Sequence, residues 1–165
     1  MQTELTAPLA DAPFAMHSIA SRLSPDARRA RQRILVHTLV QGRPFNIVRN
    51  HGLASAREIE ELLVQKAMVA DARGDVPFIY PVSALPTHHR VTLAEGRTFS
   101  AMCAIDALGA AFTFAQDTQI QSKCSRCGEP IYLRLQDGRI ASAAPAGVHV
   151  LHMDLNQLDD WAASC

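Results

Sequence analysis

The sequence has no excess of charge of either sign and no long apolar run. Sixteen Lys and Arg residues balance sixteen Asp and Glu residues in a chain of 165. No overall field therefore attracts nucleic acid or an anionic membrane. The start, MQTELTAPLADAPF, lacks the basic and apolar parts of a signal peptide, and no stretch reaches the roughly 20 apolar residues of a membrane span. We expect a cytoplasmic protein that has neither a membrane nor a nucleic acid as its partner.

Cysteine is scarce as well. The chain has four, at Cys103, Cys124, Cys127 and Cys165. In a cytosolic chain of this size, so few cysteines are more typical of thiols, metal ligands or catalytic groups than of a disulfide framework. Apolar residues make up 48% and charged residues 19% of the chain, values that are ordinary for a globular protein. We expect a folded protein whose chemistry is found at its cysteines.

The first part of the chain is predicted to be helical. Residues 1–22 have no clear periodicity and are expected to form a flexible arm. Ser24 and Pro25 are a typical N-cap and first residue of a helix that Gly42 would end. A short helix is expected after Pro44, and a third helix after a capping-box pattern that runs from Ser55 to Glu58. Residues 23–73 are thus predicted to form a small helical subdomain.

Such short helices also occur in helix-turn-helix modules that bind DNA. The third predicted helix, however, carries Glu58, Glu60 and Glu61 against Arg57 and Lys66. This balance of charge is poor for a helix lying against phosphates. A structural role for these helices is favoured over DNA binding, which stays open as an alternative.

After Gly74 the pattern favours strands. Alternating runs are VPFIYPV, HHRVTLAEG, TQIQSKC, PIYLRLQDG, RIASAA and GVHVLHMDL, and Asp137-Gly138 is a hairpin turn between two of them. One helix-like stretch, FSAMCAIDALGAAFTF, interrupts the series. His88 and His89 would point to opposite faces of one strand, so they are not expected to bind one ion. The chain is predicted to be α+β: a helix-turn-helix-like subdomain, then a mostly antiparallel sheet with an inserted helix over residues 74–165.

Cys103 and Asp106 would lie about one turn apart on one face of that helix. The surrounding residues are small or apolar, so the carboxylate would be buried, and its ionised form would be costly without a partner. One interpretation is a thiol and a carboxylate that serve one site. The other is that Asp106 bonds nearby backbone groups while Cys103 is an ordinary buried thiol.

Cys124 and Cys127 form a C-x2-C-G pattern at the end of a predicted strand, with the spacing at which two thiolates chelate zinc. The sequence has no second C-x2-C or H-x3-H pair. A complete zinc site would have to borrow ligands from His149, His152, Cys165, Cys103 or another subunit. A structural zinc stays an alternative, and two small side chains beside a tight turn are favoured.

The order of these motifs resembles the core of the organomercurial (alkylmercury) lyases. The resemblance is carried by RTFSAMCAIDALGAAFTF, then QIQSKCSRCGEPIYLRL, then SAAPAGVHVLHM, and extends weakly to LVQGRPFNIVRNHGLASAREIEELL. It implies that Cys103 and Asp106 are catalytic, that Cys124 is structural and that Cys165 falls near the position of the second catalytic cysteine. Cys127 is outside the family pattern. Compared with that pattern, we expect the core to be shortened at its C-terminus.

The resemblance implies protonolysis of carbon–mercury bonds in mercury detoxification. Two thiolates are suitable ligands for soft mercury, and a carboxylate could move the proton. No organic cofactor is implied; free cellular thiols would be co-reactants, organomercurials the substrates and mercuric reductase a partner that receives mercury(II). Two alternatives stay open: a non-catalytic thiol-based metal-binding or sensing protein on the same fold, and an inert relative kept for an interaction.

Overall fold

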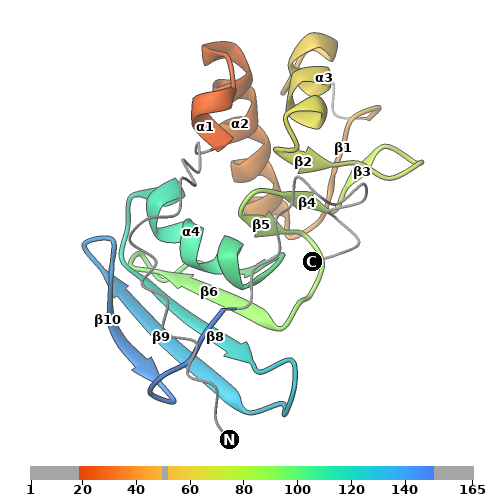
Figure 1. Cartoon of the computed structure of the whole chain (residues 1–165). Helices are drawn as coiled ribbons and strands as arrows, with labels where there is room; N and C mark the ends of the chain where they lie inside the picture. The colour runs from red at the N-terminus through yellow and green to blue at the C-terminus, as the bar shows by residue number, and fades with distance from the viewer. Residues whose placement is uncertain (1–18, 50–51, 151–165) are drawn as a thin grey trace, which may run out of the picture.

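The computed structural model describes residues 19–49 and 52–150 of the chain. Three helices stand at one end, a mostly antiparallel sheet forms the rest, and a fourth helix lies on that sheet (Figure 1). This arrangement confirms the predicted α+β class. The division of the chain into an arm, a helical subdomain and a core stays a prediction. In the described part of the chain, no helix is long and apolar enough to cross a membrane.

The three N-terminal helices are α1 (Ile19–Arg22), α2 (Pro25–Gln41) and α3 (Ala56–Val64). The predicted caps are present: the Ser24 side chain accepts from the N–H of Ala27, and Gly42 ends α2 in the left-handed conformation. Ser55 and Glu58 form the expected capping box of α3. Glu61 also accepts hydrogen bonds from the backbone N–H and hydroxyl of Ser24, at 2.6 and 2.8 Å. This carboxylate ties α3 to the start of α2.

Among the described residues, the main sheet has eight strands in the order β10-β9-β8-β6-β7-β5-β4-β2, all paired antiparallel. A separate two-stranded sheet pairs β1 with β3. The strands are β1 (Phe45–Asn46), β2 (Met68–Val69), β3 (Asp75–Val76), β4 (Phe78–Ile79), β5 (Val82–Ser83), β6 (His89–Leu93), β7 (Thr98–Ala101), β8 (Thr118–Lys123), β9 (Pro130–Gln136) and β10 (Arg139–Ala144).

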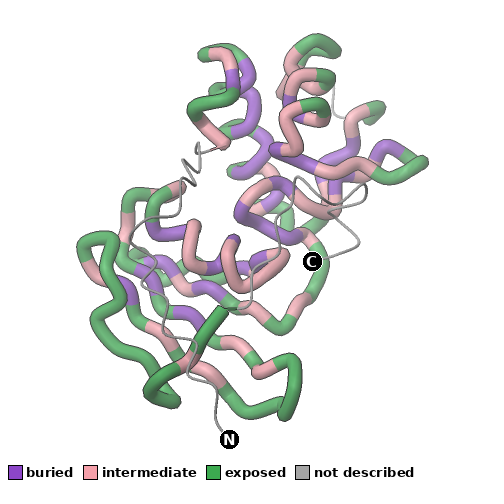
Figure 2. The backbone as a smooth tube through the Cα atoms, in the orientation of Figure 1, coloured by how far each residue is buried: buried purple, intermediate pink, exposed green. Residues whose placement is uncertain are grey.

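The core lies where the helices meet the middle of the sheet. Helix α4 (Ala104–Phe114) packs on β6, β7 and β8, and α2 packs on β4 and β5 (Figure 1). Fully buried side chains include Ile34 of α2, Ile79 of β4 and Val91 of β6. Burial falls away toward β9 and β10, whose residues are mostly exposed (Figure 2). The core therefore fixes the start of α4 and the ends of the central strands.

Three details of the sequence prediction are wrong. Phe45–Asn46 form a strand where a short helix was expected, because they pair with Val76 and Asp75. Thr98–Ala101 form β7, so the inserted helix begins only at Ala104. Residues 147–150 of the predicted last strand are not in a strand, and the rest of that segment lies outside the described residues. The Asp137-Gly138 hairpin is confirmed, since both residues have positive φ, at 49° and 70°.

Candidate active site

Cys103 and Asp106 meet at the first turn of α4. Cys103 is the N-cap residue of this helix, with extended backbone angles (φ −141°, ψ 179°). Asp106 is the third helical residue, and its carboxylate accepts hydrogen bonds from the thiol and the backbone N–H of Cys103. The bond from the Cys103 N–H to Asp106 is the carboxylate half of a capping box; the Cys103 side chain makes no cap hydrogen bond to the helix backbone. Asp106 therefore bonds nearby backbone, as one interpretation expected, and it also contacts the thiol; that the two groups serve one site stays a prediction.

Burial makes the Asp106 carboxyl unusual. Its side chain is only 6% exposed, and among the described residues Oδ2 has no hydrogen-bond partner. Desolvation raises the pKa of Asp106 to about 6, although the hydrogen bonds from Cys103 oppose the rise. A carboxyl with this pKa can both accept and release a proton near neutral pH. The prediction that Asp106 is buried is confirmed.

Tyr80 contacts α4 at Gly109 and Thr113, and it was not singled out from the sequence. A Cβ placed on Gly109 of α4 would meet the Tyr80 hydroxyl at 2.0 Å, so a larger residue there would force the Tyr80 side chain to move. The Tyr80 hydroxyl and the Thr113 side chain are also hydrogen-bonded to each other. Burial raises the pKa of Tyr80, and the charge of nearby Asp106 adds to the rise. Tyr80 therefore stays neutral and wedges against the helix that carries Asp106.

Arg31 connects Tyr80 to α2. It is 8% exposed, donates from Nη2 to the Tyr80 carbonyl oxygen at 2.6 Å, and its guanidinium lies 5.4 Å from the centre of the Tyr80 ring. Burial lowers the pKa of Arg31, while Tyr80 opposes that change. An arginine on the buried stripe of α2, beside Ala30 and Ile34, was the one sequence signal that could have revealed this contact.

The second cysteine pair lies in the turn after β8. The N–H groups of Cys127 and Arg126, and then the Cys127 thiol, donate to the sulfur of Cys124 and lower the pKa of that thiol. Cys124 is half-buried and Cys127 is exposed. Among residues 19–49 and 52–150, no group of three or more His, Cys, Asp or Glu side chains could hold a metal ion. The ligands that a structural zinc would need are therefore not assembled in this part of the chain.

The neighbouring residues His88 and His89 differ in burial. His89 of β6 is half-buried and its Nδ1 lies 2.9 Å from the Ser122 hydroxyl of β8, whereas His88 is exposed. Burial, and then the charge of His88, lowers the pKa of His89. The ring is thus held between two central strands. Cys165 and His152 lie outside the described residues.

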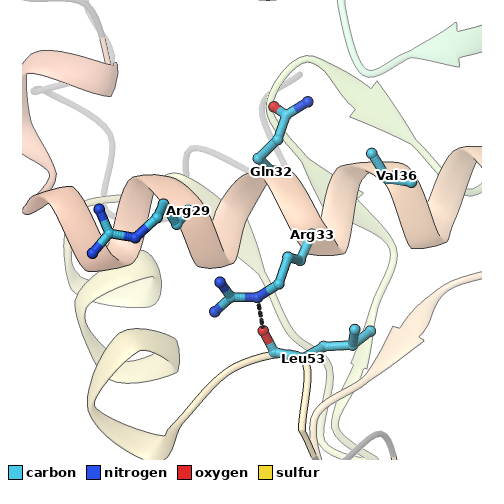
Figure 3. Close-up of a pocket in the computed structure, with 5 residues that line it drawn as sticks. All are labelled: Arg29, Gln32, Arg33, Val36 and Leu53. Carbon is cyan, nitrogen blue, oxygen red and sulfur yellow. Dashed lines mark hydrogen bonds between the residues drawn. The ribbon is translucent and has the colours of Figure 1, made fainter.

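A groove of about 470 Å³ lies at the helical end of the chain. It is lined by four residues of α2 and by Leu53, and Arg33 points across it to donate to the Leu53 carbonyl oxygen (Figure 3). Of the residues that the structure describes, neither Asp106 nor Cys103, Cys124 or Cys127 lines this groove. It is an open feature of the helical end and is separate from the site on α4.

A family model described as alkylmercury lyase matches residues 82–165, about half of the chain. The chain belongs to the alkylmercury lyase family. The match includes Cys103, Asp106, Cys124 and Cys165, so the resemblance predicted from the sequence is confirmed. Residues 1–81 of this chain, which include α2 and Tyr80, lie outside the matched region.

A solved structure, the mercury-bound form of MerB2, has a similar fold. The two share 22% identity with a TM-score of 0.57, and the match covers 78% of this chain and 64% of that one. The chain thus spans less than two thirds of the length of the MerB2 chain. No curated protein matches.

Proposed function

We propose that this protein cleaves carbon–mercury bonds in organomercurials by protonolysis. The observation that carries the proposal is the contact between the Cys103 thiol and the buried Asp106 carboxyl with a pKa of about 6. Membership of the alkylmercury lyase family supports the same chemistry. The fold shared with the mercury-bound form of MerB2 is compatible with it.

In this proposal, two thiolates bind the mercury of the substrate. Mercury(II) is a soft cation and prefers sulfur to oxygen ligands. A free thiol is only a few per cent ionised at neutral pH, so a base must take its proton. Asp106 is within hydrogen-bond reach of Cys103 and can act as that base. Cys165 is proposed as the second sulfur ligand.

The reaction then balances without a redox step. Two thiols and one R–Hg⁺ give R–H, a mercury(II) dithiolate and one released proton. The carbon–mercury bond breaks, a carbon–hydrogen bond forms, and mercury stays at +2. Asp106 takes a proton from a thiol and hands it to the carbon as mercury is retained by sulfur. The step uses no organic cofactor.

Free cellular thiols would deliver the organomercurial and take mercury(II) away as co-reactants, and mercuric reductase is the proposed receiving partner. We propose that the reaction takes place in the cytoplasm. Structural zinc has no role in this scheme.

A single-turnover assay tests the proposal. The purified full chain is mixed with excess monothiol and methylmercury, and methane and mercury speciation are followed together. We expect one methane per chain for the parent and for Ser125→Ala, a control at an exposed turn position, and none for Cys103→Ser. Tight mercury binding without methane would refute the lyase and leave the metal-binding alternative in its place.

A further inference from the structure

The turn after β8 brings a second pair of sulfurs together. The Cys124 N–H donates to the Glu129 carbonyl oxygen, and the Gly128 N–H donates to the Cys124 carbonyl oxygen, both at 2.9 Å. The N–H groups of Arg126 and Cys127 point at the Cys124 sulfur, and the Cys127 thiol is in hydrogen-bond contact with it. The turn thus fixes two neighbouring sulfurs, and Cys127 is open to solvent.

The number of protein ligands at this turn decides which metal ion it could bind. Zinc in structural sites is almost always held by four ligands. In the part of the chain that the structure describes, the cysteine pair is not joined by a third His, Cys, Asp or Glu ligand. Two thiolates alone satisfy a soft ion of low coordination number, and mercury(II) is such an ion.

We infer that Cys124 and Cys127 form a second mercury(II) site, separate from Cys103. On binding, Hg²⁺ forms two sulfur–mercury bonds, two thiol protons leave to solvent, and mercury stays at +2. The two backbone N–H groups that face the Cys124 sulfur stabilise its thiolate in the complex. This binding does not depend on the proposed lyase activity; only the cellular source of the mercury(II) does.

The Cys124–Cys127 pair and Cys103 lie at the same end of the central strands β7 and β8. Ala101 of β7 pairs with His89 of β6, and His89 contacts Ser122 of β8, so these residues form one row across three strands. Neighbouring strands are about 4.8 Å apart, which separates β7 and β8 by about 10 Å. Cys103 is two residues beyond Ala101, and Cys124 is two residues beyond Ser122. The loop after β8 and the start of α4 accordingly lie on one side of the molecule (Figure 1).

The test uses the double variant Cys103→Ser/Cys165→Ser. Because the chain has four cysteines, this variant keeps only Cys124 and Cys127. It is titrated with mercuric chloride against a competing monothiol, and binding is followed by sulfur-to-mercury charge-transfer absorption. X-ray absorption at the mercury edge gives the number of sulfur neighbours. Ser125→Ala in the same background is the matched control, and circular dichroism checks the fold of each variant.

We expect one mercury per monomeric chain with two sulfur neighbours, unchanged in the control. Adding Cys127→Ser removes the chelate and should weaken binding by at least about 100-fold. Cys124→Ser provides a second, independent loss of the pair. Binding that survives both changes, one mercury shared by two chains, or zinc held by both sulfurs in four-coordinate form would each overturn the inference. These outcomes leave the methane assay untouched, so the two proposals fail separately.

Discussion

Asp106 accepts hydrogen bonds from both the thiol and the backbone N–H of Cys103, so one carboxylate contacts both the first turn of α4 and the Cys103 sulfur. The backbone bond fixes where the carboxylate lies, and burial sets when it is charged. Position and proton affinity are therefore controlled by the same helical turn.

The first prediction concerns stability and pH. The pKa of Asp106 is about 6 in the folded protein against a usual 3.8, so folding favours the protonated form. This contribution is fully present below pH 3.8 and is lost as the pH rises through about 6. The cost at neutral pH is about 3 kcal/mol, from about 1.4 kcal/mol per pKa unit. Asp106→Asn does not ionise and so avoids this cost.

The measurement is urea unfolding of both proteins between about pH 4 and pH 8. Relative to the parent, Asp106→Asn should gain stability as the pH rises to about 6 and then level off, above a constant offset from the altered hydrogen bonds. Asp137→Asn, at an exposed turn position, is the matched control and should show no such trend. A difference between Asp106→Asn and the parent that does not change with pH would mean that Asp106 has an ordinary pKa when folded.

The second prediction concerns the pH dependence of cleavage. Only the ionised carboxylate can take a thiol proton, and the pKa of Asp106 is raised to about 6. Single-turnover rates of methane release should therefore rise with pH through about 6 in the parent. The rising limb should vanish in Asp106→Asn. If the parent showed a limb only near the pKa of a free thiol, about 8.5, Asp106 would not be the base.

The third prediction concerns the support of α4 by Tyr80. Gly109→Ala would place a methyl group 2.0 Å from the Tyr80 hydroxyl, and overpacking of this kind typically costs about 1–3 kcal/mol. Tyr80→Phe removes the clashing oxygen, so the double variant should recover part of the loss in a double-mutant cycle of unfolding free energies. Strictly additive effects would mean that the two residues do not contact each other.

Local signals in the sequence predicted the parts of the fold that local chemistry decides. The Ser24 cap, the Ser55–Glu58 capping box and the Asp137-Gly138 turn depend on residues within four positions of each other, and all three are present. The contact of Cys103 with Asp106 was predictable for the same reason, since three residues of spacing suit either one helical face or one capping box.

Distant partners decide what the sequence did not reveal. Phe45–Asn46 are extended because Val76 and Asp75 pair with them, and Thr98–Ala101 are extended because β5 and β6 flank them. In both places tertiary pairing overrides local propensity. Tyr80 was missed because its partners, Arg31 and Gly109, lie far from it in sequence. The predicted role of Cys165 concerns a residue outside the described part of the chain.

The most direct test of the account is a single turnover of methylmercury in deuterium oxide by the parent and Asp106→Asn. Methane isotopes and protein-bound mercury are measured in the same sample, with Asp137→Asn as the control. Protonolysis predicts singly deuterated methane from the parent and the control. Asp106→Asn should keep mercury on sulfur while methane release slows by about 100-fold or more. Methane without deuterium, or an unimpaired rate in Asp106→Asn, would contradict proton delivery by Asp106.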